Sequence, residues 1–177
     1  MQKNKLLIGI ILVAFAFGAR NGIRFGYLGP LTNTYTNSAF LITIILSLGT
    51  FLGIFLNPLI GKRSDRTWTR YGRRRPYIMV SLPISALFTI FIPHSPNYTV
   101  LIVLVFLESF AVIVGFTPLF SLISDNFETE KRGKINAVLI FSLGLGAVCS
   151  IGIGYRLWDI NYYLFFYTVA GIIFVSS

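Results

Sequence analysis

Residues 57–76 read Asn57-Pro-Leu-Ile-Gly61-Lys-Arg-Ser-Asp65-Arg66-Thr-Trp-Thr-Arg70-Tyr-Gly72-Arg73-Arg-Arg-Pro76 and separate two long apolar stretches. The segment holds a glycine, an acid four residues later, seven basic residues and a second glycine four residues before a proline. Glycine and proline commonly end helices, so we expect the preceding helix to end near Gly61 and a basic loop to turn at Gly72. Asp65 lies among the basic residues, so we expect its carboxylate to stay ionised and paired.

Apolar stretches on both sides of this segment extend along the whole chain. Of the 177 residues, 55% are hydrophobic and 12% are charged, and the charged share is about half that of an ordinary soluble domain. Several apolar runs reach about 18 residues, enough to cross a hydrocarbon core of roughly 30 Å as a helix. We therefore predict an all-α membrane protein with the lipid bilayer as its solvent. Residues 1–177 are expected to form one bundle of six transmembrane helices, at about 6–29, 38–60, 77–93, 98–123, 135–154 and 162–177.

Lys and Arg residues indicate the orientation of this bundle. They lie at the start of the chain and in the second and fourth loops between helices: Lys3, Lys5; Lys62, Arg63, Arg66, Arg70, Arg73, Arg74, Arg75; Lys131, Arg132, Lys134. By the positive-inside rule these loops and both termini are cytoplasmic. The net charge of +9 therefore fits loops that face anionic lipid, and no nucleic-acid partner is expected.

Side chains that commonly catalyse reactions or bind metals are scarce. The chain has one cysteine, Cys149, and one histidine, His94, so it offers neither an intrachain disulfide nor a Cys/His cluster for a metal. We find no Ser/His/Asp set and no phosphate loop, and we expect neither an enzyme nor a cofactor. Outer loops are expected at Pro30–Asn37, Pro93–Asn97 and Trp158–Tyr163, with His94 as a solvated loop residue.

Three ionisable side chains, Arg20, Arg24 and Glu108, lie inside the predicted helices. An ionised group in hydrocarbon costs at least about 2.5 kcal/mol, so each should face a cavity or a partner. At about 1.5 Å of rise per residue, Arg20 and Glu108 lie within roughly 10 Å of each other in depth, so they could form an ion pair. Arg24 shares a helix face with Arg20, and we expect it to extend to the outer interface beside Tyr27.

Small residues recur at every fourth position on two of the predicted helices. The two rows are Gly49, Gly53, Asn57 and Gly61, and Ser142, Gly146, Ser150 and Gly154. Such rows form flat stripes where another helix backbone can approach closely. We therefore expect tight helix contacts, either within the bundle or against a second bundle.

The order of residues in the 57–76 segment is more specific than its charge. It resembles the loop signature of the major facilitator superfamily, in which Gly, Asp, Arg, Gly and Arg recur between helices two and three. The matching residues are Gly61, Asp65, Arg66, Gly72 and Arg73, with residues 67–70 inserted. This insertion and the ending from Gly72 to Pro76 look like those of glycoside/cation symporters and plant sucrose/proton symporters.

A second match follows the fourth predicted helix. The chain reads Pro118-Leu-Phe-Ser-Leu-Ile-Ser-Asp125, and Arg132-Gly133 precedes the next apolar run. This resembles the superfamily region where helix four ends in an acidic turn and an Arg-Gly pair opens helix five. Locally, Glu128 and Glu130, which lie between the two parts of this match, would also suit an ordinary helix N-terminus. Two motifs in the right order extend the resemblance over the whole chain.

The resemblance implies a secondary active transporter that moves a small solute by alternating access. Its most specific form is sugar symport coupled to a proton or sodium. Helices one and four line the solute path in such proteins, which makes Arg20, Arg24 and Glu108 the candidate substrate and ion pathway. Some symporters carry a proton on a helix-four carboxylate. Glu108 looks like that carboxylate, although Ser109 lies closer to its position when counted from Pro118.

The resemblance also implies a cytoplasmic gate. Asp65 and Arg73 would latch helix ends to an opposite bundle in one state, and losing the latch would shift the inward and outward populations. The expected gate residues are Gly61, Asp65, Arg66, Gly72, Arg73, Asp125 and Arg132. These residues would act on conformation and not on solute binding.

A full transporter of this kind has two six-helix bundles with the solute site between them. We expect this chain to be the N-terminal bundle of a twelve-helix protein in the plasma membrane. A separately encoded second half and a homodimer are the alternatives. Alternative functions are an efflux carrier for another solute and a truncated half without transport. Residues 142–154 contain no proline, whereas drug/proton antiporters have a Gly-Pro signature there, which weighs against efflux.

Overall fold

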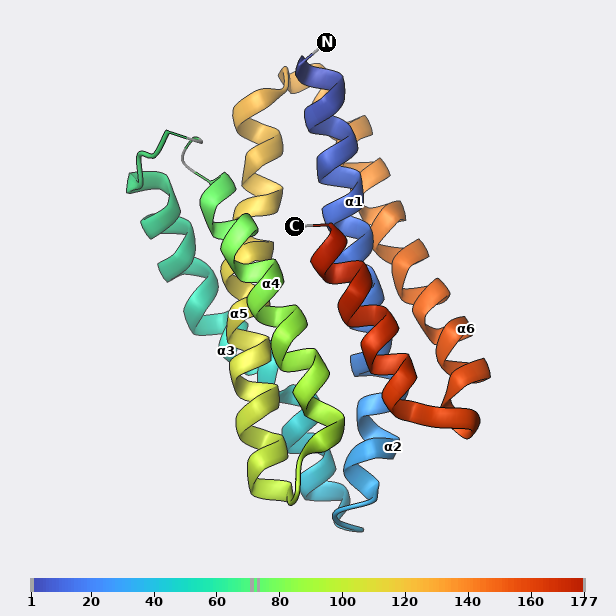
Figure 1. Cartoon of the computed structure of the whole chain (residues 1–177). Helices are drawn as coiled ribbons and strands as arrows, with labels where there is room; N and C mark the ends of the chain where they lie inside the picture. Colours follow the sequence, from blue (N-terminus) through green and yellow to red (C-terminus); the bar gives the residue numbers. More distant parts are fainter. Residues whose placement is uncertain (1, 71, 73, 177) are drawn as a thin grey trace.

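The computed structural model describes residues 2–70, 72 and 74–176, and every element assigned in these residues is a helix (Figure 1). The elements are α1 (Gln2–Gly22), the π-helix η1 (Ile23–Tyr27), α2 (Leu28–Asn33), α3 (Ala39–Arg66), α4 (Arg75–Phe91), the 3₁₀ helix η2 (Ile92–His94), α5 (Tyr98–Asn126) and α6 (Thr129–Val175). Five helical stretches in this part of the chain are long and apolar enough to cross a membrane: Lys5–Asn33, Ala39–Arg66, Arg75–His94, Tyr98–Asn126 and Thr129–Val175. The predicted all-α fold is confirmed.

The first of these stretches contains a π turn. The sequence predicted an uninterrupted helix over 6–29, whereas the structure widens the helix at Ile23–Tyr27. Pro30 has no N–H to donate to the carbonyl of Gly26, four residues earlier, and this favours the wider turn. Single π turns are frequent at functional sites. This one carries Arg24.

The basic segment after α3 differs from the prediction at its start. Gly61 does not end the helix, because α3 continues to Arg66 through Lys and Arg residues that favour helix. The turn itself lies at Gly72, as predicted, with a φ of 103° that a side chain would strain. The next helix, α4, starts at Arg75 with Pro76 in its first turn, a position that suits proline.

The last helix, α6, bends sharply at Asn161. This residue has a non-helical φ of −165° and ψ of 100°, and its side-chain oxygen accepts hydrogen bonds from the backbone N–H of Tyr163 (3.0 Å) and Leu164 (3.4 Å). Asn161 thus caps the arm that follows, and that arm runs back toward the end with the N-terminus (Figure 1). The sequence predicted separate helices at 135–154 and 162–177 with a loop at 158–163. The break at Asn161 lies inside the predicted loop, although the structure confines it to this one residue, because helical residues reach Asn161 from both sides.

Small residues join α1 to the first arm of α6. A Cβ at Gly18 would overlap the backbone of Leu143, and a Cβ at Gly146 would overlap the backbone of Phe15. The row that begins at Ser142 therefore makes the tight helix contact predicted for it, and it does so inside the bundle.

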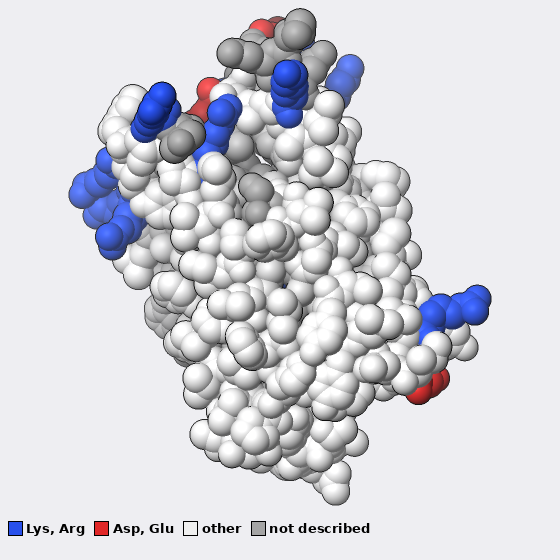
Figure 2. All heavy atoms as spheres, in the orientation of Figure 1, with Lys and Arg blue, Asp and Glu red and all other residues white. Residues whose placement is uncertain are grey.

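Most of the visible charged residues gather at one end of the molecule. Figure 2 shows most Lys and Arg at the end that holds the N-terminus, above a broad band of uncharged surface, and a smaller charged group low on the right side of the view. Exposed apolar side chains of the molecule include Phe141 and Val148 of α6. Such a band suits a hydrocarbon surrounding.

Candidate functional site

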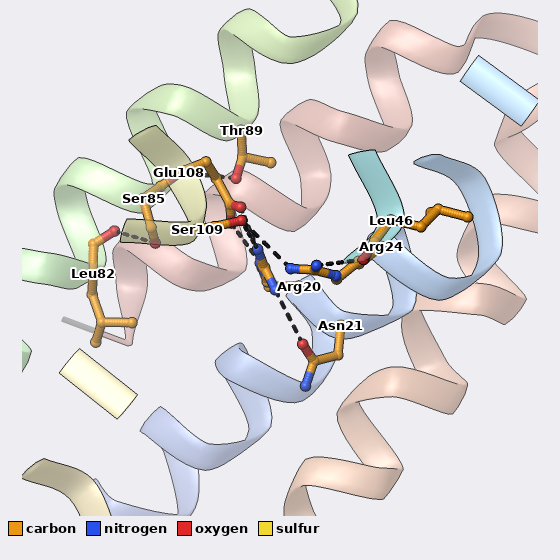
Figure 3. Close-up of polar contacts among 9 residues, drawn as sticks. All are labelled: Arg20, Asn21, Arg24, Leu46, Leu82, Ser85, Thr89, Glu108 and Ser109. Carbon is orange, nitrogen blue, oxygen red and sulfur yellow. Dashed lines mark hydrogen bonds and ion pairs between the residues drawn. The ribbon is translucent and has the colours of Figure 1, made fainter. Parts of the chain in front are cut away.

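Arg20 of α1 and Glu108 of α5 form an ion pair inside the helix bundle (Figure 3). Arg20 Nε donates to Glu108 Oε1 at 2.5 Å, and Arg20 Nη2 donates to Glu108 Oε2. Both residues are buried, with 7% and 3% of their surface exposed. Two parallel contacts between a guanidinium and a carboxylate are strong and fix the geometry. The ion pair that the sequence allowed is therefore present.

Arg24 does not extend to the outer interface, which corrects the sequence prediction. It is 7% exposed, and its Nη2 donates to the backbone carbonyl of Leu46 at 2.5 Å. Its Nη1 donates to Ser109 Oγ at 3.4 Å. The space for the guanidinium comes from Gly49 of α3, where any Cβ would overlap it. Arg24 does not need to extend to the membrane interface, because this glycine and a backbone carbonyl accommodate its charge inside the bundle.

A cavity of about 450 Å³ lies beside these residues, within the range of roughly 300–1,000 Å³ that small-molecule sites occupy. Its wall is formed by α1, η1, α3 and α5: Phe17, Arg20, Asn21, Arg24, Phe25, Gly49, Thr50, Gly53, Ile54, Asn57, Ser109, Val112, Ile113 and Phe116. The wall contains neutral amides, hydroxyls and aromatic rings beside the two arginines. Such a wall can hydrogen-bond hydroxyl groups and pack against apolar faces of a small molecule.

The small residues of α3 line this cavity instead of packing against a second helix backbone. Gly49 faces Arg24, and Gly53 has only the Asn57 amide near it. The Asn57 Oδ1 accepts a hydrogen bond from Thr117 Oγ1 of α5 at 2.7 Å. Gly61 has open space around it. Within the described residues this row makes no tight contact with another helix backbone of the bundle, because Gly49, Gly53 and Asn57 border the cavity. The alternative, contact with a second bundle, stays a prediction.

At the charged end, Arg74 contacts two carboxylates. Arg74 Nη2 lies 2.7 Å from Asp65 Oδ1 at the end of α3, and Arg74 Nε lies 2.7 Å from Asp125 Oδ2 at the end of α5. Arg74 itself is 9% exposed. The predicted pairing of Asp65 is therefore confirmed, and it joins the ends of three helices. We call Asp65, Arg74 and Asp125 the charge cluster.

The remaining predicted gate residues lie around the charge cluster or apart from it. Arg73 lies outside the described residues. Arg66 is exposed at the last position of α3, and Gly72 is exposed in the turn. Arg132 binds backbone carbonyls at the end of α5, Ser124 O at 2.8 Å and Phe127 O at 2.9 Å, so it caps that helix as basic side chains commonly do.

Sequence reasoning missed two residues with well-defined contacts. Arg74 stands among three consecutive arginines, and it is buried whereas Arg75 is exposed. His94 was expected to be a solvated loop residue. It is exposed, as expected, and in addition its Nδ1 lies 3.1 Å from Ile90 O and its Nε2 lies 3.0 Å from the hydroxyl of Tyr167 on α6. In the described part of the chain, no group of His, Cys, Asp and Glu residues is arranged to hold a metal ion.

Comparison with known proteins gives one family match along nearly the whole chain. The Major Facilitator Superfamily profile matches residues 6–177. Solute carrier family 45 member 3 of Homo sapiens is 30% identical over 177 aligned positions, which cover 89% of this chain and 31% of that protein. The chain therefore spans about a third of the length of this relative.

Two sugar transporters match over shorter segments. Sucrose transport protein SUC4 of Arabidopsis thaliana is 34% identical over 55 residues, covering 31% of this chain and 11% of that protein. Proton-associated sugar transporter A of Homo sapiens is 47% identical over 47 residues, covering 27% of this chain and 6% of that protein.

Proposed function

The chain belongs to the major facilitator superfamily, and on that basis we propose that it forms the N-terminal bundle of a secondary active transporter. The transporter moves a sugar by alternating access and couples it to a cation, with a proton as the first candidate and sodium as the second. The observation that carries this proposal is the buried Arg20–Glu108 pair beside the cavity. Ionisable groups at membrane depth commonly mark solute and ion pathways.

The bundle has six membrane spans in this proposal, with both termini cytoplasmic. The fifth and sixth spans are the two arms of α6 on either side of Asn161. A straight helix of 47 residues would measure about 70 Å at roughly 1.5 Å per residue, more than twice the hydrocarbon thickness. The bend supports two spans, and the gathering of Lys and Arg at one end supports the orientation.

A second six-helix bundle closes the cavity from the other side. The wall described above comes from α1, η1, α3 and α5 alone. The exposed apolar side chains Phe51, Ile54 and Phe55 lie on α3, next to this wall. The second bundle belongs to the same protein, to a separately encoded half or to a second copy of this chain.

Glu108 carries the coupling proton in this proposal, and Arg20 and Arg24 belong with it to the substrate and ion pathway. An ionised Glu108 holds Arg20 in a bidentate contact. A protonated carboxyl group binds a guanidinium more weakly, because the charge attraction is lost. Protonation therefore frees N–H groups of Arg20 next to the cavity, and a solute there can accept hydrogen bonds from them. The proton and the solute thus favour the same state, in which Arg20 is released from Glu108.

The charge cluster acts as the cytoplasmic gate. Asp65, Arg74 and Asp125 join the ends of α3, α4 and α5, and Gly61, Arg66, Gly72, Arg73 and Arg132 complete the set of gate residues. Relative movement of these helix ends requires the two ion pairs to break or rearrange. The gate changes the populations of the inward and outward states and leaves solute contacts unchanged. The plasma membrane is the proposed location.

Uptake of labelled sugars into vesicles from cells expressing the native gene tests this function. An inward-directed proton gradient is expected to drive accumulation. Glu108→Gln should abolish accumulation while solute exchange at equal pH remains, because exchange needs no net proton movement. Glu130→Gln, which removes an exposed carboxylate from the first turn of α6, is the matched control and should accumulate sugar normally. Normal accumulation by Glu108→Gln would exclude Glu108 as the proton carrier.

A further inference from the structure

Glu108 borders a different cavity from the one described above. In the described part of the chain, Arg20 and Arg24 line the cavity of about 450 Å³, whereas Glu108 does not. Glu108 lines a second cavity of about 10 Å³, which we call the small cavity. Its wall consists of Arg20, Ile23, Arg24, Leu28, Thr89, Ile92, Val105 and Glu108. Among the described residues the two cavities share Arg20 and Arg24, so these arginines separate the Glu108 carboxylate from the larger cavity.

Thr89 of α4 is the neutral polar side chain in the described wall of the small cavity. It is 1% exposed, and its hydroxyl donates to the backbone carbonyl of Ser85 at 2.8 Å. Figure 3 shows both residues on α4 beside Glu108 of α5. A threonine hydroxyl has one hydrogen to donate and two lone pairs that accept. Because the Ser85 carbonyl takes the hydrogen, Thr89 offers lone pairs to the small cavity.

These lone pairs suit the protonated form of Glu108 and not its ionised form. An ionised carboxylate accepts hydrogen bonds, and Glu108 accepts them from Arg20 Nε and Nη2. A protonated carboxyl group has one O–H that needs an acceptor. Apart from Thr89, the described side chains around Glu108 in the small cavity are apolar or are arginines, and an arginine side chain has no acceptor. Thr89 is therefore the side chain that fits a protonated Glu108.

We propose that Thr89 accepts a hydrogen bond from protonated Glu108 and thereby holds the carboxyl group away from Arg20. This inference rests on the proposed function of Glu108 as the proton carrier. The small cavity has room for about one water-sized group, so the carboxyl group can turn into it while α4 stays in place. The released N–H groups of Arg20 then face the larger cavity. Thr89 is a positioning residue, because it acts through Glu108 and does not line the larger cavity.

The neighbours of Glu108 determine the pH at which it takes up a proton. In the described wall of the small cavity, the charged neighbours are Arg20 of α1 and Arg24 of η1, and α4 contributes the neutral Thr89. Both arginines favour the ionised form of Glu108, whereas a hydrogen bond from its O–H to Thr89 favours the protonated form. Without the Thr89 hydroxyl, a lower pH is therefore needed to protonate Glu108 and to drive uptake.

Uptake of labelled sugar at a series of external pH values, in vesicles from cells expressing the native gene, tests this role. Thr89→Val removes the hydroxyl and keeps the branched shape. It should lower the pH of half-maximal uptake by about one unit, roughly the tenfold effect of one lost hydrogen bond. The KM for solute exchange at equal pH should change less than about twofold.

Two further variants separate the hydroxyl from the packing of α4. Thr89→Ser keeps a hydroxyl and should retain the native pH profile. Ser85→Ala removes another buried hydroxyl one turn away on the same helix and is the matched control, because Ser85 is not among the residues that line either cavity. Its pH profile should also match that of the native protein.

An unchanged pH profile in Thr89→Val would overturn the inference. A shift to higher pH would also overturn it, because the hydroxyl would then donate to the ionised carboxylate. Thr89→Ala, whose side chain is smaller than the native one, replaces Thr89→Val if that variant does not fold. Normal accumulation by Glu108→Gln, or no sugar uptake by the folded native protein, would instead count against the proposed function.

Infrared spectra of the purified protein test the hydrogen bond without uptake. The C=O band of protonated Glu108 is identified by its loss in Glu108→Gln. This band should move in Thr89→Val or Thr89→Ala, because the carboxyl group loses its acceptor, and it should stay in place in Ser85→Ala. A Glu108 band at the same frequency with and without the Thr89 hydroxyl would overturn the inference.

Discussion

Gly49 of α3 lies directly against the guanidinium of Arg24, so that a Cβ at this glycine would overlap the Arg24 Nη1 atom. The absence of a side chain at position 49 thus provides the place for a buried positive charge. This relationship joins the first helical stretch to α3 at the cavity wall. A substitution at Gly49 therefore tests whether the position of Arg24 affects solute binding.

Gly49→Ala is expected to displace the Arg24 guanidinium and raise the KM for the transported solute. The side chain can shift because its far end is flexible, so we expect stability to fall by about 1 kcal/mol, at the low end of the cost of overpacking. Uptake kinetics and thermal unfolding of the purified protein measure the two effects. Gly152→Ala on α6 has open space around it and is the matched control. An unchanged KM in Gly49→Ala would show that the position of Arg24 does not affect solute binding.

Arg20→Leu is expected to destabilise the protein by about 3–5 kcal/mol, because it leaves Glu108 ionised and buried without its partner. The double variant Arg20→Leu/Glu108→Leu should recover most of this loss, since both charges are then gone. Thermal unfolding in detergent measures both variants. A loss below about 1 kcal/mol in Arg20→Leu would mean that Arg24 replaces Arg20 as the partner of Glu108.

The Arg20–Glu108 pair could be anticipated from the sequence, whereas the place of Arg24 could not. The cost of a charge in hydrocarbon and the rise of a helix suffice to bring Arg20 and Glu108 to the same depth. The position of Arg24 depends on a glycine and a carbonyl of another helix. That information lies in the packing of two helices and not in the local sequence around position 24.

The helix ends could likewise be predicted only where the local sequence determines them. The turn at Gly72 follows from glycine's tolerance of a positive φ. The reversal in α6 lies inside the loop expected at 158–163, but its sharpness depends on one asparagine side chain that caps the following arm. Arg74 could not be distinguished from its neighbours, because three consecutive arginines have the same local chemistry; the structure shows Arg74 buried and Arg75 exposed.

Arg74→Gln is expected to shift the balance between the inward and outward states, because it removes the positive charge from between Asp65 and Asp125. The two carboxylates would then repel each other and separate the ends of α3 and α5. Labelling of cysteines introduced on either side of the membrane measures the shift, and solute affinity should stay within about twofold. Arg75→Gln, at the exposed neighbouring residue, is the matched control. Equal labelling of the two variants would argue against a gate at the charge cluster.

Gly146→Val is expected to prevent the close approach of α6 to α1, because a side chain at this position overlaps the backbone of Phe15. Backbone atoms of a packed helix cannot move aside as a flexible side chain can, so the helices must separate. Overpacking of this kind costs about 1–3 kcal/mol or more. Gly144→Val replaces a glycine of the same helix at a position with open space around it. It therefore removes a glycine without creating an overlap and is the matched control. Thermal unfolding and the yield of folded protein should therefore fall for Gly146→Val and stay near the native values for Gly144→Val. Equal stability of the two variants would show that α1 and α6 do not rely on this close contact.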